Sequence, residues 1–446
     1  MVNHRHPSST RPRPVVIDRA GPMDLTVLAA DHAPVPMNMG AILMFQDGIA
    51  PSAIRELLTE RLPRIPRLRQ ALRRTPFGCG RPVWLDDPDF DLDRHMDVVS
   101  WAEPGSRELL DTAAELLCRP LRTDRPLWRA TLVTATSHAA LVVVVHHVLA
   151  DGLGGLAVLA ALADEGPEQP VPDFPRPPPD SRTLLADAMR ERLRAVRALP
   201  TALRQGIAGL RELGFGWTRI HLVEPTSLNQ PTSPRRRLTR ITTPLDEIAA
   251  AAHRHGGTVN DVVLAAVTGA LLEIMSERGE HPPRLVVSVP ISGRRSTTAN
   301  ELGNNTGVRP ISVPATLDDS ARLTEIITRT RDASRSTVRA SSSGPLGALF
   351  RILHRTGLFQ RFIDHQRLVH TFETNLRGPA VALHLAGHRV DALIPLVVTP
   401  GNVGVTFAVL SYAGTLGVTV IADPDLVPDQ DILTSAIHTR FIRLVH

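Results

Sequence analysis

The segment Leu141–Gly152 reads LVVVVHHVLADG, an apolar run of strand type that ends in two adjacent histidines and is followed by Asp-Gly. A run of β-branched residues predicts a strand buried on both faces, with titratable side chains at the edge of a sheet. Because successive strand side chains point to opposite faces, His146 and His147 cannot both face one site. One histidine can therefore act on a substrate while the other is held in packing.

The same alternation argues against a metal site built from His146, His147 and Asp151, because metal ligands must converge on one point. The simpler alternative is that both histidines are core residues at a strand end. That alternative must also explain why two histidines, an aspartate and a glycine occur together in this short segment. The spacing His-His-x-x-x-Asp-Gly resembles the signature of the chloramphenicol-acetyltransferase-like acyltransferases and of the condensation domains of peptide synthetases.

The chain has 446 residues, too many for one ordinary core and suited to two domains of about 200 residues each. Seven prolines lie between residues 167 and 179, a composition that predicts an extended, semi-rigid connector. We therefore expect a flexible basic arm at 1–20, an N-terminal domain with the histidine motif at 21–165, a Pro-rich linker at 166–180 and a C-terminal domain at 181–446.

The charged residues exclude several classes of function. The 50 basic residues are all arginines, which excludes lysine-based Schiff-base chemistry, and 45 acidic residues nearly balance them. Aromatic residues for base stacking are scarce, and Tyr412 is the only tyrosine, so we expect no nucleic-acid partner. Two cysteines are too few for a disulfide framework or a zinc site. No run of 18 apolar residues indicates a membrane span, and the N-terminus lacks a signal-peptide core, so we expect a cytoplasmic protein.

The segment Leu184–Leu213 has apolar residues at helical spacing with arginines set among them. Such a basic amphipathic helix can lie on an anionic membrane surface. Alternatively, its apolar stripe packs on the body of the protein and the arginines are solvated, and the sequence favours this second interpretation.

A further helix is expected to begin after Thr258, a good N-cap residue, so that Asn260 and Asp261 lie in its first turn. The two side chains can simply cap the helix. The functional alternative is that the positive helix end and Asn260 lie over reacting oxygens.

Further motifs narrow the resemblance to the wax ester synthase/diacylglycerol acyltransferase family. They follow the family's order over almost the whole chain: Pro22-Met23-Asp24, Pro36-Met37-x-Met39-Gly40, Pro126-Leu127-Trp128, Asn260-Asp261, Val289-Pro290-x-Ser292-x-Arg294, Gly303-Asn304 and Thr374-Asn375-x-x-Gly378-Pro379. Two departures concern the acceptor pocket: Arg377 stands where the family usually has proline, and the segment 37–39 lacks the usual histidine. The resemblance implies an α/β fold of two chloramphenicol-acetyltransferase-like domains, with facing mixed sheets and a tunnel between them.

The resemblance also implies a reaction, the transfer of a fatty acyl group from acyl-CoA to the hydroxyl of a long-chain alcohol or diacylglycerol. The family assigns the general base to the second histidine, His147. In the superfamily the aspartate, here Asp151 next to Gly152, pairs with an arginine to hold the loop, and Arg294 is the candidate partner. We expect Asn260 to stabilise the oxyanion, with supporting roles for Asp261, Asn304 and Asn375. Acyl-CoA is a co-substrate, and we expect no metal or other cofactor.

Three alternatives stay open at this point. The first is a tailoring acyltransferase that modifies a secondary metabolite, with a carrier-protein thioester as donor. The second is a non-catalytic protein of the same fold that binds acyl chains or a partner, although binding alone does not require a base. The third adds peripheral association with the inner membrane or lipid droplets through Leu184–Leu213, and it is compatible with catalysis.

Overall fold

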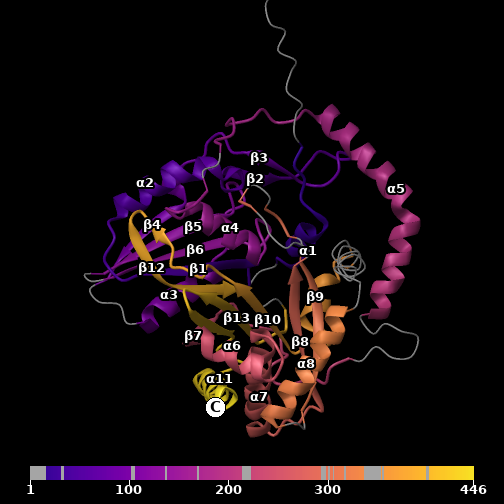
Figure 1. Ribbon diagram of the computed structural model, residues 1–446. Helices are drawn as coiled ribbons and strands as arrows, with labels where there is room; N and C mark the ends of the chain where they lie inside the picture. Colours follow the sequence, from indigo (N-terminus) through magenta and orange to yellow (C-terminus); the bar gives the residue numbers. More distant parts are fainter. Residues whose placement is uncertain are drawn as a thin grey trace, which may run out of the picture.

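The apolar run that ends at His146 forms a central strand of a mixed six-stranded sheet in the computed structural model of the protein (Figure 1). This strand, β6 (Ala139–His146), pairs antiparallel with β1 (Asn38–Phe45) on one side and with β5 (Trp128–Thr134) on the other. The structure describes residues 17–31, 35–101, 106–135, 138–167, 170–212, 222–292, 298–299, 302–304, 306–315, 318–335, 353, 356–397 and 401–446.

The two faces of this first sheet pack against different partners. Its strands follow the order β11-β12-β1-β6-β5-β4, with β4 (Met96–Ser100) parallel to β5 at one edge. Val142 and Val144 pack in one cluster with α3 (Ser106–Cys118) and with residues of the second sheet. Residues of the opposite face, such as Leu141, belong to the cluster that contains α2 (Pro51–Arg61) and α4 (Gly152–Leu162). Near this sheet lie α1 (Pro22–Ala30) and the hairpin of β2 (Gln70–Arg73) and β3 (Val83–Asp86).

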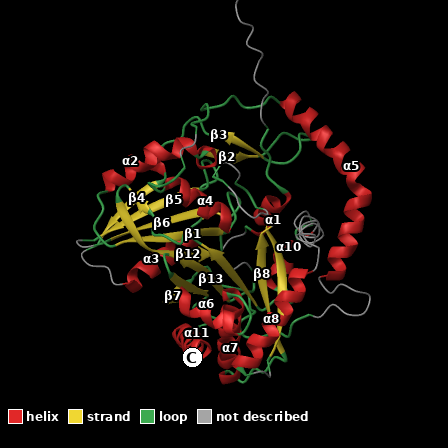
Figure 2. Cartoon of the chain, viewed as in Figure 1, coloured by secondary structure: helices red, strands yellow, loops and turns green. Residues whose placement is uncertain are grey.

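A second six-stranded sheet has the order β7-β14-β13-β10-β8-β9. Its strands are β7 (Arg237–Pro244), β8 (Arg284–Ser292), β9 (Thr306–Pro314), β10 (Thr371–Arg377), β13 (Val405–Tyr412) and β14 (Thr415–Ala422). Figure 2 shows a group of helices beside this sheet. They are α6 (Leu245–Arg254), α7 (Val259–Glu277), α8 (Asp319–Arg335) and α11 (Gln430–Val445). The short helix α10 (Phe359–Asp364) lies outside this group, near α1. Two α/β units with mixed sheets confirm the predicted fold class.

The core beside the second sheet is built around α7, and most of its apolar residues from Val262 to Met275 are buried between the sheet and the neighbouring helices. Within the described part of the chain, only α7 is long and apolar enough to cross a membrane, and 72% of the relevant window is buried. Burial of this kind is what the core helix of a globular domain shows.

Two strands from the second half of the chain complete the first sheet. The strands β11 (His384–Leu385) and β12 (His388–Val397) follow β10 in sequence, yet β12 pairs antiparallel with β1. The segment 384–397 therefore belongs structurally with the first unit. The domain limits expected from sequence did not include this exchange, and the division of the chain stays a prediction. Of the expected arm, only residues 17–20 lie within the described part.

Candidate active site

The two histidines of the motif have different surroundings. The His146 ring is buried, with its Nδ1 accepting from the Val148 N–H (3.1 Å) and its Nε2 at 3.1 Å from Asp31 Oδ2. Asp31 also accepts from the Met37 N–H (2.9 Å). His146 therefore ties the loop before β1 to the end of β6, as a residue held in packing would.

His147 follows the last residue of β6, and its backbone is held from both sides. Its N–H donates to the Met37 carbonyl, and its own carbonyl accepts from Asn304 Nδ2, each at 2.7 Å. The ring lines a large apolar cavity, and Nδ1 is buried without a partner among the described residues. Burial lowers the pKa of His147, chiefly through desolvation of the charged form. The imidazole is therefore neutral at neutral pH, the state that a general base requires.

Asn304 in turn is fixed by Asp24 of α1. One carboxylate oxygen of Asp24 accepts from both the backbone N–H (3.1 Å) and Nδ2 (2.9 Å) of Asn304, and the other accepts from the Gly21 N–H (2.7 Å). Asp24 is 4% exposed. The Pro-Met-Asp and Gly-Asn motifs thus meet at the carbonyl of His147. Asp24 was named from the sequence only as part of the Pro22-Met23-Asp24 motif. The hydrogen bond between Asp24 and Asn304 was not predicted, because 280 residues separate the two.

Asp151 begins the helix that follows the histidines. Its Oδ1 accepts from the Gly154 N–H (2.9 Å), which caps α4 and fixes the loop after His147. A Cβ added at Gly152 would lie 2.8 Å from Leu376 on β10, so glycine permits α4 and the second sheet to approach closely. The expected partner of Asp151, Arg294, lies outside the described residues.

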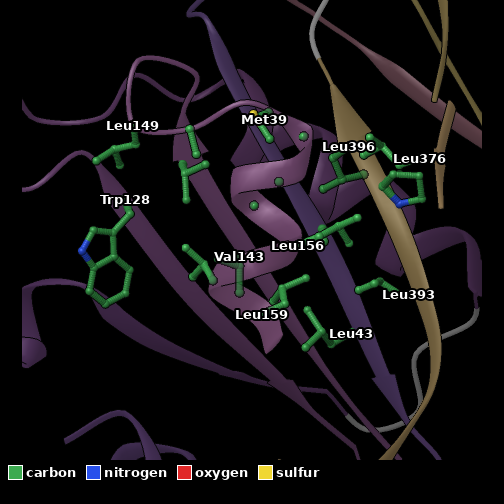
Figure 3. A pocket seen from close by; sticks show the side chains of 18 of the residues that line it. Met39, Leu43, Trp128, Val143, Leu149, Leu156, Leu159, Leu376, Leu393 and Leu396 are labelled. Carbon is green, nitrogen blue, oxygen red and sulfur yellow. The ribbon is translucent and has the colours of Figure 1, made fainter. Parts of the chain in front are cut away.

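The cavity beside His147 has a volume of about 490 Å³ and is mostly apolar (Figure 3). Figure 3 shows Leu156 and Leu159 of α4 near Val143 of β6 and Leu43 of β1, with Leu376 of the second sheet farther along. Polar groups on its wall are few: His147, Asp151, Thr374, Asn375 and Arg377. Its size falls in the range of small-molecule sites, and its lining suits a hydrocarbon chain.

Trp128 of the Pro-Leu-Trp motif contributes an apolar wall to this cavity. Its indole N–H donates to the Leu68 carbonyl (2.8 Å), and its ring stacks on His95 with 4.6 Å between ring centroids. The indole is therefore satisfied as a donor, and its ring adds apolar surface to the cavity.

The structure does not bring Asn260 and Asp261 to the cavity of His147. They line a second cavity with Val289 and Ile291 of β8, whereas Pro290, on the opposite face of that strand, lines the first. Asp261 and Thr258 form a capping box, in which the Thr258 N–H donates to Asp261 Oδ2 (2.8 Å). Helix capping uses Asp261 Oδ2, while Asp261 Oδ1 accepts from the Thr330 hydroxyl of α8 (2.8 Å), so the side chain also joins α7 to α8.

One buried titratable residue, Glu373, was not predicted from the sequence. Glu373 lies on β10, two residues before Asn375 and therefore on the same face of the strand. Glu373 is fully buried, and neither carboxyl oxygen has a partner among the described residues. Burial and, second, the charge of Asp261 raise the pKa of Glu373 to about 8. The strand reads TFETNLR, and this mostly polar stretch gave no signal that Glu373 is buried.

No group of three or more His, Cys, Asp or Glu side chains that could hold a metal ion occurs in the described part of the chain.

The fold and the site together define the class of protein. Two α/β units with mixed sheets, and a His-His-x-x-x-Asp-Gly loop beside a cavity lined from both sheets, are those of a chloramphenicol-acetyltransferase-like acyltransferase.

The particular family follows from comparison with known proteins. The chain belongs to the wax ester synthase/diacylglycerol acyltransferase family, whose catalytic-domain model matches residues 21–263 and whose C-terminal-domain model matches residues 302–444. The protein is therefore an acyltransferase enzyme, and the family prediction is confirmed.

Similar proteins include the probable diacyglycerol O-acyltransferase tgs1 of Mycobacterium tuberculosis H37Rv, which is 31% identical over 434 residues and 92% of each chain. The solved wax ester synthase/diacylglycerol acyltransferase of Marinobacter aquaeolei VT8 matches with a TM-score of 0.67 and 21% identity, over 96% of this chain and 98% of that one. The starter condensation domain of rhizomide synthetase RzmA, solved as a mutant in complex with C8-CoA, matches with a TM-score of 0.64 and 15% identity, over 96% of this chain and 94% of that one. At these identities the two structures support the fold.

Proposed function

We propose that this enzyme transfers a fatty acyl group from acyl-CoA to the hydroxyl of a long-chain alcohol or diacylglycerol, with His147 as general base. One observation carries the proposal: a neutral imidazole lines an apolar cavity of about 490 Å³, on a residue whose backbone N–H and carbonyl are both hydrogen-bonded. The names of the family and of its relatives supply the two classes of acceptor.

The proposed chemistry follows from the state of the ring. An alcohol does not ionise at neutral pH, so His147 accepts the hydroxyl proton while the oxygen attacks the thioester carbonyl. The tetrahedral intermediate then expels the CoA thiolate, which takes the proton back from His147 as the ester is released. General-base catalysis of this kind contributes roughly 10²–10⁴-fold. The transfer is redox-neutral, and acyl-CoA is the only co-substrate that we propose.

The acyl chain is proposed to lie in the apolar cavity, between α4 and the first sheet. Each buried methylene contributes about 0.8 kcal/mol, so the leucines and valines of the wall supply affinity in proportion to chain length. For the oxyanion, Asn375 becomes the better candidate, because it lines the same cavity as His147 whereas Asn260 lines the other.

The direct test measures thiol release from a panel of acyl-CoA donors, with fatty alcohols and with diacylglycerol as acceptors. His147→Ala should lose most of the turnover while circular dichroism shows an intact fold. His438→Ala, at an exposed position on α11, is the matched control. Near-normal ester formation by His147→Ala would remove the base assignment. In the same assay, Asn375→Ala should lower kcat more than Asn260→Ala.

The donor panel should include carrier-protein thioesters. Arg377, at the cavity wall in place of the family's usual proline, is the feature that favours a different acceptor. If a carrier-protein thioester is turned over and none of the acyl-CoA donors is, the enzyme is a tailoring acyltransferase instead. Absence of thioester cleavage with every donor would point to a non-catalytic acyl-binding protein.

We also propose that the enzyme works in the cytoplasm and associates peripherally with the inner membrane or with lipid droplets, because its proposed acceptors partition into lipid. The helix at 181–212 supports this proposal, because it presents apolar and basic side chains to solvent.

A further inference from the structure

The helix α5 (Ser181–Glu212) runs along the outside of the molecule, apart from both sheets (Figure 1). It contacts the body through one face near its N-terminus, where Leu184 and Ala188 are buried beside Cys79 and Gly80. The sequence favoured a helix whose apolar stripe packs on the body. For the described residues that prediction is wrong, because a second set of apolar side chains faces solvent.

These exposed side chains form a single stripe. Leu185, Met189, Leu193 and Val196 are spaced four, four and three residues apart, which places them on one face of a helix. Their exposed fractions are 45%, 48%, 56% and 68%. A contiguous exposed apolar surface on a folded protein marks a site of interaction rather than a part of the core.

Between residues 187 and 197 of α5, the acidic side chains face the body and most of the arginines face solvent; Arg192 is the exception, with Nη2 donating to the Gly78 carbonyl (2.9 Å). Asp187 pairs with Arg19 (2.7 Å) and Glu191 pairs with Arg81 (2.6 Å), so both carboxylates face the body. Arg190, Arg194 and Arg197 are exposed, and the described residues offer them no ion pair or hydrogen bond. The outward surface of this segment is therefore apolar and basic.

We propose that this outer face of α5, the stripe of Leu185, Met189, Leu193 and Val196 with its flanking arginines, docks on an anionic phospholipid bilayer. The inference rests on the proposed peripheral association and assigns the residues that produce it. Apolar side chains enter the acyl boundary while arginines contact phosphate headgroups. A second copy of the chain suits this face less well, because a two-fold contact would set arginines against arginines.

Vesicle co-sedimentation of the full-length protein tests the proposal. Wild-type protein should bind vesicles of phosphatidylglycerol mixed with phosphatidylcholine, and should bind pure phosphatidylcholine much less. The variant Arg190→Gln/Arg194→Gln/Arg197→Gln should weaken binding about fivefold per arginine, hence on the order of 100-fold. The variant Leu185→Ser/Met189→Ser/Leu193→Ser/Val196→Ser should lose binding to both kinds of vesicle.

A matched control removes three exposed arginines elsewhere, Arg94, Arg122 and Arg389, each replaced by glutamine. This control should bind like the wild type, and every variant should keep the wild-type rate with soluble short-chain substrates. Absence of binding to anionic vesicles, or equal loss in control and α5 variants, would overturn the proposal. So would a wild-type dimer in sedimentation that the serine variant converts to monomer. Because thiol release is measured separately, failure of docking and failure of catalysis are distinguishable.

Discussion

At the scale of single residues, the proposed role of His147 as general base predicts the pH dependence of the reaction. Burial lowers the pKa of this ring from its ordinary 6.5, so the base form persists below that pH. The acid limb of kcat/KM should therefore have its midpoint below pH 6.5, with a flat rate above it. Initial rates of thiol release between pH 5 and 8 check this, and a midpoint above 6.5 would contradict the assigned surroundings of the ring.

Glu373 should limit stability on the alkaline side. Its pKa of about 8 means that the folded protein keeps a proton that the unfolded chain releases near pH 4.5. The free energy of unfolding therefore falls by about 1.4 kcal/mol per pH unit between these values as the pH rises. Glu373→Gln should raise Tm at pH 9 and change it little at pH 5.

The matched control is Glu277→Gln, at an exposed position on α7, which should leave the pH profile of Tm unchanged. Equal alkaline sensitivity of Glu373→Gln and wild type would show that Glu373 has a partner when folded.

At the scale of elements, α1 and the loop before β9 hold the turn that carries His147, through Asp24 and Asn304. Asp24→Ala removes the one carboxylate oxygen that accepts from both the backbone N–H and Nδ2 of Asn304, so Asn304 is no longer held in place to donate to the carbonyl of His147. We expect kcat to fall about tenfold with little change in KM, because positioning of the base is lost rather than binding. Asp24→Asn keeps an acceptor oxygen and should recover part of kcat. A loss confined to Tm in both variants would indicate a merely structural contact.

Local patterns were predictable because neighbouring residues determine them. The valines before His146 gave the central strand, and Thr258 with Asp261 gave the capped start of α7. The second cavity around Asn260 was not predictable, because it depends on which face of β8 meets α7. The outward face of α5 was not predictable either: periodicity locates an apolar stripe, whereas only tertiary contacts decide what covers it.

At the scale of the whole molecule, the two units share structure across the cavity. Strand β12 enters the first sheet from the second half of the chain, and Leu393 and Leu396 on it line the cavity together with Leu376 of the second sheet. No local pattern marks 384–397 as a partner of β1, since the pairing joins residues about 350 apart. The cavity is therefore a property of the complete chain, and removal of β12 would open it.

The depth of this shared cavity should set the acyl chain length. Val143 lies on its wall between α4 and the first sheet, so Val143→Phe fills space that the distal part of a long chain would occupy. Excluding three or four methylenes at about 0.8 kcal/mol each predicts a loss of roughly 50- to 200-fold in kcat/KM for a C16 acyl-CoA. A C4 acyl-CoA should be used nearly as before. Val98→Phe, the same substitution at an exposed strand position, should change neither rate. An equal loss for both chain lengths in Val143→Phe would show that the acyl chain lies elsewhere.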